Sequence, residues 1–72
     1  MLTIEEQAHI SFRELRRSRK ELYRAIKEAE RNPSVSARAL VHNLLDEMLK
    51  KKRQFEELTI MRDAVWQNDY RQ

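Results

Sequence analysis

The chain of 72 residues contains no glycine, and proline occurs once, at Pro33. Glycine supplies the backbone conformations that tight hairpin turns and phosphate-binding loops require. A chain without it is poorly suited to β-hairpins, and it excludes Walker loops, glycine-rich dinucleotide sites and nucleophile elbows. The dominant residues are Leu, Ala, Glu, Lys and Arg, which favour helices. The sequence therefore predicts an all-α protein with very few turns.

The strongest break in the chain is the segment ERNPSVSAR at residues 30–38. Proline disfavours helical geometry in the residue before it, so Asn32 is expected to close a first helix. Ser34 or Ser36 can then cap a second helix by accepting a hydrogen bond from an amide of its first turn. We therefore expect the chain to reverse its direction at this break.

A second start signal lies at the beginning of the chain, where Thr3 and Glu6 have the spacing of a capping box. We expect a first helix over about residues 3–31, a turn over 32–34 and a second helix over about 35–69. A link this short makes the two helices antiparallel neighbours. The prediction is one antiparallel two-helix hairpin domain spanning residues 1–72.

Apolar residues follow a 4-3 spacing in the first helix, which is the pattern of a seam packed against another helix at a shallow angle. This row consists of Ala8, Phe12, Leu15, Leu22, Ile26 and Ala29, with Arg19 in the remaining slot. The second helix has a broader stripe: Leu40, Val41, Leu44, Leu45, Met48 and Leu49, and then Phe55, Leu58, Met61 and Val65. The predicted core or dimer seam comprises Phe12, Leu15, Leu22, Ile26, Leu44, Leu45, Met48, Phe55 and Leu58.

The small size of the chain gives a second reason to expect more than two helices in the assembly. A chain this short buries a modest core, and without cysteine no disulfide can reinforce it. The broad stripe of the second helix can face two neighbours. We therefore expect two hairpins to dimerise into a four-helix bundle.

A cluster of positive charge interrupts both apolar rows. Folding the chain at the proline pairs residues whose numbers add up to roughly 68, so residues 16–20 are expected to lie level with 48–52. Eight of the fifteen basic residues meet there and form what we call the basic waist: Arg16, Arg17, Arg19, Lys20, Lys50, Lys51, Lys52 and Arg53.

Three interpretations of the basic waist remain open. It is a solvated belt neutralised by interleaved acids, a docking surface for an acidic protein patch, or a sequence-independent phosphate-binding surface for nucleic acid. Arg19 occupies a seam slot, where a lone charge is costly. We expect it either to pair with a carboxylate such as Glu47 or to point outward.

The far end of the second helix carries an aromatic tip formed by Val65, Trp66 and Tyr70. Large aromatic residues often dominate the energetics of protein interfaces. The tip is expected either to contact a partner or to be covered, and a dimer mate is one candidate cover. The other candidates come from the first helix and its start: Met1, Leu2, Ile4 and Ile10.

The residues offer little for catalysis or for metal binding. His9 and His42 are expected to lie far apart in the hairpin, and two histidines are too few for a typical zinc site. We therefore expect no enzyme activity, no catalytic residues, no metal and no cofactor. No apolar run is long enough for a membrane span, and the first ten residues lack the features of a signal peptide, so cytoplasmic residence is expected.

Two classes of function follow. The first is a non-enzymatic protein-binding module, an adaptor, chaperone or inhibitor, that binds itself or another protein through apolar helix faces and the basic waist. The alternative is a nucleic-acid-binding regulator that uses the basic waist of a four-helix dimer; the net charge of +3 permits either partner. In length, helix number and single turn the chain is similar to plasmid copy-number RNA modulators, to co-chaperones of type III secretion needle subunits, and to small phage or plasmid inhibitors of host proteins. That resemblance implies a bacterial or phage regulator.

Overall fold

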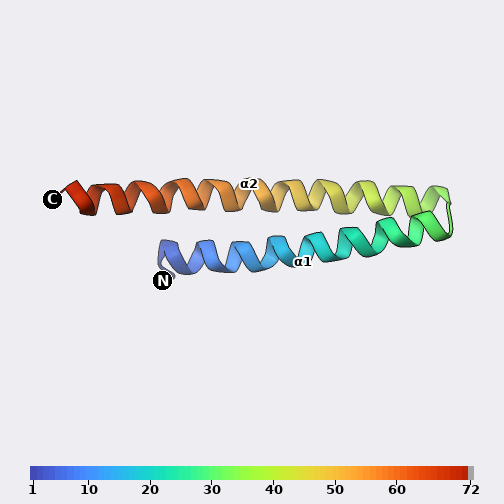
Figure 1. The fold of residues 1–72 in the computed structure, drawn as a ribbon, viewed down its shortest axis with the longest axis horizontal. Coiled ribbons are helices and arrows are strands. Elements are labelled where there is room, and N and C mark those ends of the chain that lie inside the picture. The colour runs from blue at the N-terminus through green and yellow to red at the C-terminus, as the bar shows by residue number, and fades with distance from the viewer. Residues whose placement is uncertain (72) are drawn as a thin grey trace.

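The computed structural model describes the backbone of residues 1–71 and the side chains of residues 1–67. Two helices, α1 (Ile4–Arg31) and α2 (Val35–Arg71), pack against each other in antiparallel orientation and form a hairpin (Figure 1). The prediction of an all-α helical hairpin is confirmed. The hairpin is a rod of 58 × 18 × 15 Å, so its core is a single seam between two helices. In the described part of the chain, no helix is long and apolar enough to cross a membrane.

Short-range hydrogen bonds fix where α1 begins and ends. The hydroxyl of Thr3 accepts a hydrogen bond from the backbone N–H of Glu6 at 3.1 Å and donates one to the Glu6 carboxylate at 3.1 Å. This arrangement satisfies an amide of the first turn that has no partner within the helix. At the other end, the backbone N–H of Asn32 donates to the carbonyl of Glu28 at 2.8 Å. The helix therefore ends directly before Pro33.

The cap of α2 is Ser34. Its hydroxyl accepts a hydrogen bond from the backbone N–H of Ala37 at 3.0 Å. α1 ends at Arg31 and α2 begins at Val35, so the chain reverses its direction within three residues, 32–34. A link this short holds the two helices side by side and fixes their register.

Two contacts across the seam define that register. The rings of Phe12 and Phe55 lie with centroids 5.5 Å apart, and the Lys51 ammonium lies 4.0 Å from the Glu14 carboxylate. The residue numbers of these pairs add up to 67 and 65, close to the predicted sum of roughly 68. An α2 residue therefore lies at about the height of the α1 residue whose number is 66 minus its own.

The seam of α1 differs from the predicted row at three positions. Its buried residues are Ala8, Ser11, Leu15, Ser18, Leu22 and Ala25, flanked by the half-buried Ile4 and Ala29. Leu15 and Leu22 are thus in the seam, whereas Phe12 is exposed on its edge and Ile26 is half-buried. The assignment of Arg19 to the seam is wrong: Ser18 fills that slot and Arg19 is exposed. The structure selects the row that buries no charge and whose small residues let the two backbones approach.

The seam of α2 is only half-buried and contains two cations. Its members recur at 4-3 spacing: Ala37, Val41, Leu44, Met48, Lys51, Phe55, Leu58 and Arg62. Leu45, which the sequence predicts to be in the seam, is exposed beside it. Lys and Arg are tolerated in a seam one side chain deep because their long stems pack on apolar neighbours while the charged ends reach water.

The two helices differ in length, with 28 residues in α1 and 37 in α2. Since residue 4 of α1 lies at about the height of residue 62, the last turns of α2 extend past the start of α1 (Figure 1). This open end of the hairpin carries Val65 and Trp66, whose side chains have no helix of their own chain fully opposite them.

Candidate protein-binding surface

One flank of the hairpin collects exposed aromatic and apolar side chains from both helices, and we call it the aromatic flank. On α1 it follows a three- or four-residue spacing through Glu5, His9, Phe12, Arg16, Arg19, Tyr23 and Ile26. On α2 it follows the same spacing through His42, Leu45, Leu49, Lys52 and Glu56 and then, past the half-buried Thr59, through Asp63 and Trp66. Residues at this spacing share one face of a helix. Two grooves show that the faces of α1 and α2 adjoin, because each groove is lined by residues of both.

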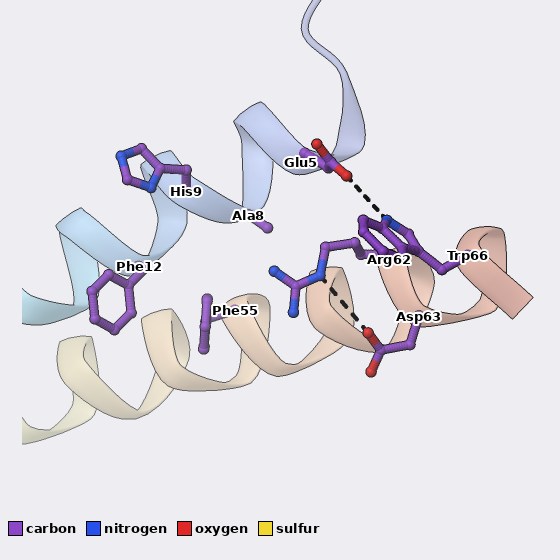
Figure 2. Close-up of a pocket in the computed structure, with 8 residues that line it drawn as sticks. All are labelled: Glu5, Ala8, His9, Phe12, Phe55, Arg62, Asp63 and Trp66. Atoms are coloured by element: carbon purple, nitrogen blue, oxygen red, sulfur yellow. Dashed lines mark hydrogen bonds and ion pairs between the residues drawn. The ribbon is translucent and has the colours of Figure 1, made fainter.

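The larger groove lies at the open end of the hairpin and has a volume of about 540 Å³ (Figure 2). It is lined by Glu5, Ala8, His9 and Phe12 of α1 and by Phe55, Arg62, Asp63 and Trp66 of α2. The tilted pair of Phe12 and Phe55, with an interplanar angle of 49°, closes one end. At the other end, the indole N–H of Trp66 donates a hydrogen bond to the Glu5 carboxylate at 3.0 Å.

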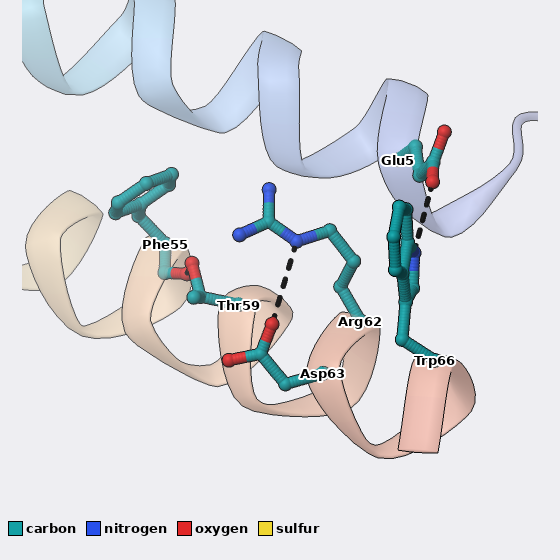
Figure 3. A network of polar contacts seen from close by, with 6 residues as sticks. All are labelled: Glu5, Phe55, Thr59, Arg62, Asp63 and Trp66. Carbon is teal, nitrogen blue, oxygen red and sulfur yellow. Dashed lines mark hydrogen bonds and ion pairs between the residues drawn. The ribbon is translucent and has the colours of Figure 1, made fainter. Parts of the chain in front are cut away.

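The α2 side of this groove is organised by contacts within the helix. Figure 3 shows Phe55, Arg62 and Trp66 projecting from α2 toward α1. The guanidinium of Arg62 is held beside Asp63, with Nε 3.8 Å from the carboxylate. The Thr59 hydroxyl donates to the carbonyl of Phe55 at 2.9 Å, which satisfies a polar group at the edge of the apolar surface. The groove therefore presents an apolar floor, an arginine and two carboxylates.

The smaller groove lies near the turn and has a volume of about 350 Å³. Ile26, Ala29, Glu30 and Pro33 line it from α1 and the link, and Arg38, Val41 and His42 line it from α2. Between the two grooves lie Tyr23, Leu45 and Leu49, all exposed. Arg16, Arg19 and Lys52 of the flank lie between the grooves as well, so the aromatic flank is a strip in which exposed apolar and aromatic side chains alternate with charged ones.

Exposure of the large aromatic side chains is what distinguishes this strip from ordinary surface. Phe12 is 45% exposed, Trp66 60% and Tyr23 62%. Scattered apolar residues are normal on a protein surface, but contiguous ones mark interaction sites. The sequence reasoning assigned no role to Tyr23; its spacing of seven residues from Arg16 is the signal that places it on the same face.

The basic waist encircles the hairpin instead of occupying one face. In α1 its residues point in several directions, and in α2 four consecutive residues, 50–53, span a full turn. Residues 16–20 lie level with about 46–50, so the two clusters overlap with a small offset. Among the described side chains, Lys51 makes the only ion pair of the waist, with Glu14. Arg16, Arg19 and Lys52 belong to the aromatic flank and Arg17, Lys20, Lys50 and Arg53 lie elsewhere on the belt.

The aromatic tip is partly described. Val65 and Trp66 are exposed, and Tyr70 lies outside the residues whose side chains the structure describes. Met1 and Leu2 are exposed as well, so the start of the chain does not cover Trp66. Within residues 1–67, the indole of Trp66 makes one hydrogen bond, to Glu5, which orients the ring and leaves most of its surface open.

The opposite flank has a different character. Its groove, about 430 Å³ in volume, is lined by Leu2, Gln7, Ile10, Ser11 and Glu14 of the first half of the chain and by Gln54, Glu57, Leu58 and Met61 of α2. Acids and amides border its apolar residues, and it holds no aromatic residue. Among the described residues, no group of three or more His, Cys, Asp or Glu side chains could hold a metal ion.

Comparison of the chain with models of protein families, with curated proteins and with solved structures gives no match.

Proposed function

We propose that this hairpin is a non-enzymatic protein-binding module and that it binds helices of a protein partner through the aromatic flank. The observation that carries the proposal is the exposed strip of Phe12, Tyr23, Leu45, Leu49 and Trp66, which runs across both helices. Helical hairpins commonly receive a further helix in the groove between their own two helices. The apolar strip supplies the area for such contact, and the charged groups along it supply specificity.

The composition of the strip supports this assignment over that of a solvated surface. Tyr, Trp, Phe and Arg are the residue types enriched in protein interfaces, and aromatic residues and arginine are also the commonest energetic hot spots. Here Phe12, Arg16, Arg19 and Tyr23 follow one another on a single helix face. The groove of the opposite flank is bordered by acids and amides, and no aromatic residue is among those that line it.

Site-specific cross-linking tests the proposal. A photoreactive benzoylphenylalanine replaces Leu49 on the aromatic flank, and in the control it replaces Ile60, which is also exposed but lies on the outer face of α2. After incubation with an extract of the source cells and irradiation, we expect protein cross-links from position 49 that excess unlabelled chain abolishes. Nuclease treatment should leave them unchanged. Equal cross-linking from both positions, or none from position 49, would refute the proposal.

A second candidate function, nucleic-acid binding, is favoured by two observations. Seven of the eight waist residues make no ion pair within the described residues, and Phe12 and Tyr23 lie on the same face as Arg16 and Arg19. Phosphate contacts release counterions, so affinity for a duplex would fall steeply with salt. Fluorescence anisotropy of a labelled duplex at several salt concentrations tests this function. Binding that is absent at low salt, or that survives replacement of Arg16 and Arg19 by glutamine, would refute it.

A further inference from the structure

From the order of charges along the aromatic flank, we infer that the flank's occupant is a second copy of this chain, packed antiparallel about a twofold axis near Phe12 and Phe55. This inference rests on the proposed function, because it names the partner of the same surface. It requires that the flank be complementary to itself when it is turned end for end.

The exposed charges of the aromatic flank are separated by sign along the hairpin. The exception beside them is the half-buried Arg62, which lines the larger groove at a height of about 4 and lies next to the Asp63 carboxylate that it offsets. With the register given by the seam contacts, the acidic residues Asp63, Glu5 and Glu56 lie at heights of about 3, 5 and 10 in α1 numbering. The basic residues follow toward the turn: Lys52, Arg16 and Arg19 lie at heights of about 14, 16 and 19. The boundary between the acidic half and the basic half falls at Phe12.

Turning one hairpin end for end about this boundary places opposite charges together. In an interface with twofold symmetry, each contact occurs twice, with the roles of the two copies exchanged. With the axis at Phe12, α1 faces α1 of the second copy, and Glu5 meets Arg19 of that copy in both contacts. On α2, Glu56 similarly meets Lys52. Phe12 meets its own copy on the axis, where a pair of aromatic rings can pack.

The apolar ends of the flank also become complementary in this arrangement. Trp66 at the open end falls at the height of His42 and Tyr23 in the second copy, beside Leu45. One carboxylate oxygen of Glu5 accepts the hydrogen bond from the Trp66 indole, and the other oxygen can accept one from Arg19 of the second copy. The exposed Trp66 side chain and the exposed strip near the turn would therefore cover each other.

The other twofold arrangement of two such flanks has its axis parallel to the helices and brings equal heights together. It sets Arg16 against Lys52 in the basic part of the strip and Glu5 against Asp63 in the acidic part, where Arg62 offsets the second like-charge contact in part. Like-charge contacts in an interface disfavour the wrong arrangement. The order of charges therefore selects the antiparallel dimer.

The overlap is also large enough for a stable dimer. It spans heights 0 to 24, which at 1.5 Å per residue is about 36 Å. With the 18 Å width of the rod, the footprint is roughly 650 Å² per chain, near the ~800 Å² per partner of a standard interface. The result is a four-helix bundle.

Charge reversal at Glu5 and Arg19 tests the arrangement by analytical ultracentrifugation. In the wild type we expect a dimer whose dissociation constant rises about tenfold or more in Glu5→Arg and in Arg19→Glu, since each like-charge contact occurs twice. An equimolar mixture of the two variants should form a heterodimer, and the double variant should regain the wild-type dissociation constant. Within one chain these residues lie fourteen positions apart on α1, so rescue can arise only between copies. Arg24→Glu, on the opposite flank, is the matched control and should leave dimerisation unchanged.

A distance measurement keeps the inference falsifiable if a variant folds poorly. The chain has no cysteine, so Lys27→Cys accepts a single spin label on the outward face of α1. Antiparallel packing places the two labels about 45–50 Å apart, whereas the parallel arrangement keeps them within about 35 Å. The shorter distance, or failure of the two charge variants to rescue each other, would overturn the inference.

The oligomeric state separates this inference from the proposed function. A monomer whose position 49 cross-links to other proteins would overturn the dimer and leave the proposed function standing. A monomer that cross-links to nothing would overturn both the dimer and the proposed function.

Discussion

Truncation of Leu22 tests whether the seam described above holds the hairpin together. Leu22 is 6% exposed in the middle of α1, and Leu→Ala removes about three carbons at ~0.8 kcal/mol each. A seam one side chain deep can relax or admit water, so the cavity adds little. We expect Leu22→Ala to lower the free energy of unfolding by about 2–3 kcal/mol. The free energy of unfolding of a domain of this size is roughly 4–11 kcal/mol, so this loss is a large share of it. The melting temperature should fall by about 10–20 °C.

The assay is urea denaturation followed by circular dichroism at one fixed chain concentration, because dimerisation makes stability depend on concentration. Ile60→Ala is the matched control: Ile60 is 68% exposed, and alanine's better helix propensity offsets part of the small loss, leaving a change of less than about 0.5 kcal/mol. A loss below 1 kcal/mol for Leu22→Ala, or equal losses for the two variants, would show that the seam has been placed on the wrong row.

Three further predictions concern the seam, the cap and the charged seam position, all measured by the same denaturation assay. Ser18→Arg should cost at least ~2 kcal/mol, because Ser18 is 5% exposed and a long side chain there is overpacked between the helices, whereas Arg19→Ala should change stability by less than ~0.5 kcal/mol. The reverse order would restore the row that contains Arg19. Thr3→Ala should cost about 1 kcal/mol by removing the cap of α1, with Thr3→Ser close to wild type, and no difference between the two would contradict the capping role. Lys51→Met should raise stability by about 0.5–1.5 kcal/mol, since an apolar side chain fills a seam position and the weak pair with Glu14 contributes little, and a net loss would contradict this.

The sequence was sufficient to predict the two helices and the turn, but not to predict which row of α1 residues is buried in the seam. Pro33 and the absence of glycine leave only one place where the chain can reverse, so the hairpin follows almost directly. The row of apolar residues was misjudged because serine and alanine carry little hydrophobic signal, while Phe12 and Ile26 carry much. A different criterion finds the seam: residues 4, 8, 11, 15, 18, 22, 25 and 29 form an unbroken 4-3 row without a charge, and the competing row contains Arg19.

The candidate surface was predictable in its parts but not as a whole. The sequence singled out Trp66 and the basic residues, and it placed Phe12 in the core. Only the register of α1 on α2 shows that Phe12, Tyr23, Leu45 and Leu49 form one strip, since that depends on which row is buried. The order of charges along the strip depends on the same register, because it interleaves residues from two helices that run in opposite directions.

The three-residue link also determines the order in which the hairpin forms and opens. Contacts beside the link join residues close in sequence, whereas the bond from Trp66 to Glu5 closes a separation of 61 residues. Loop closure costs more entropy as the separation grows, so the helices should zip together from the link and fray from the open end. Amide hydrogen exchange should therefore be slowest near residues 22 and 44 and fastest at the first turns of α1. A partner that covers the open end would slow amide hydrogen exchange most in the first turns of α1, where the free chain opens most often. Binding of the partner would therefore prolong the lifetime of the folded hairpin.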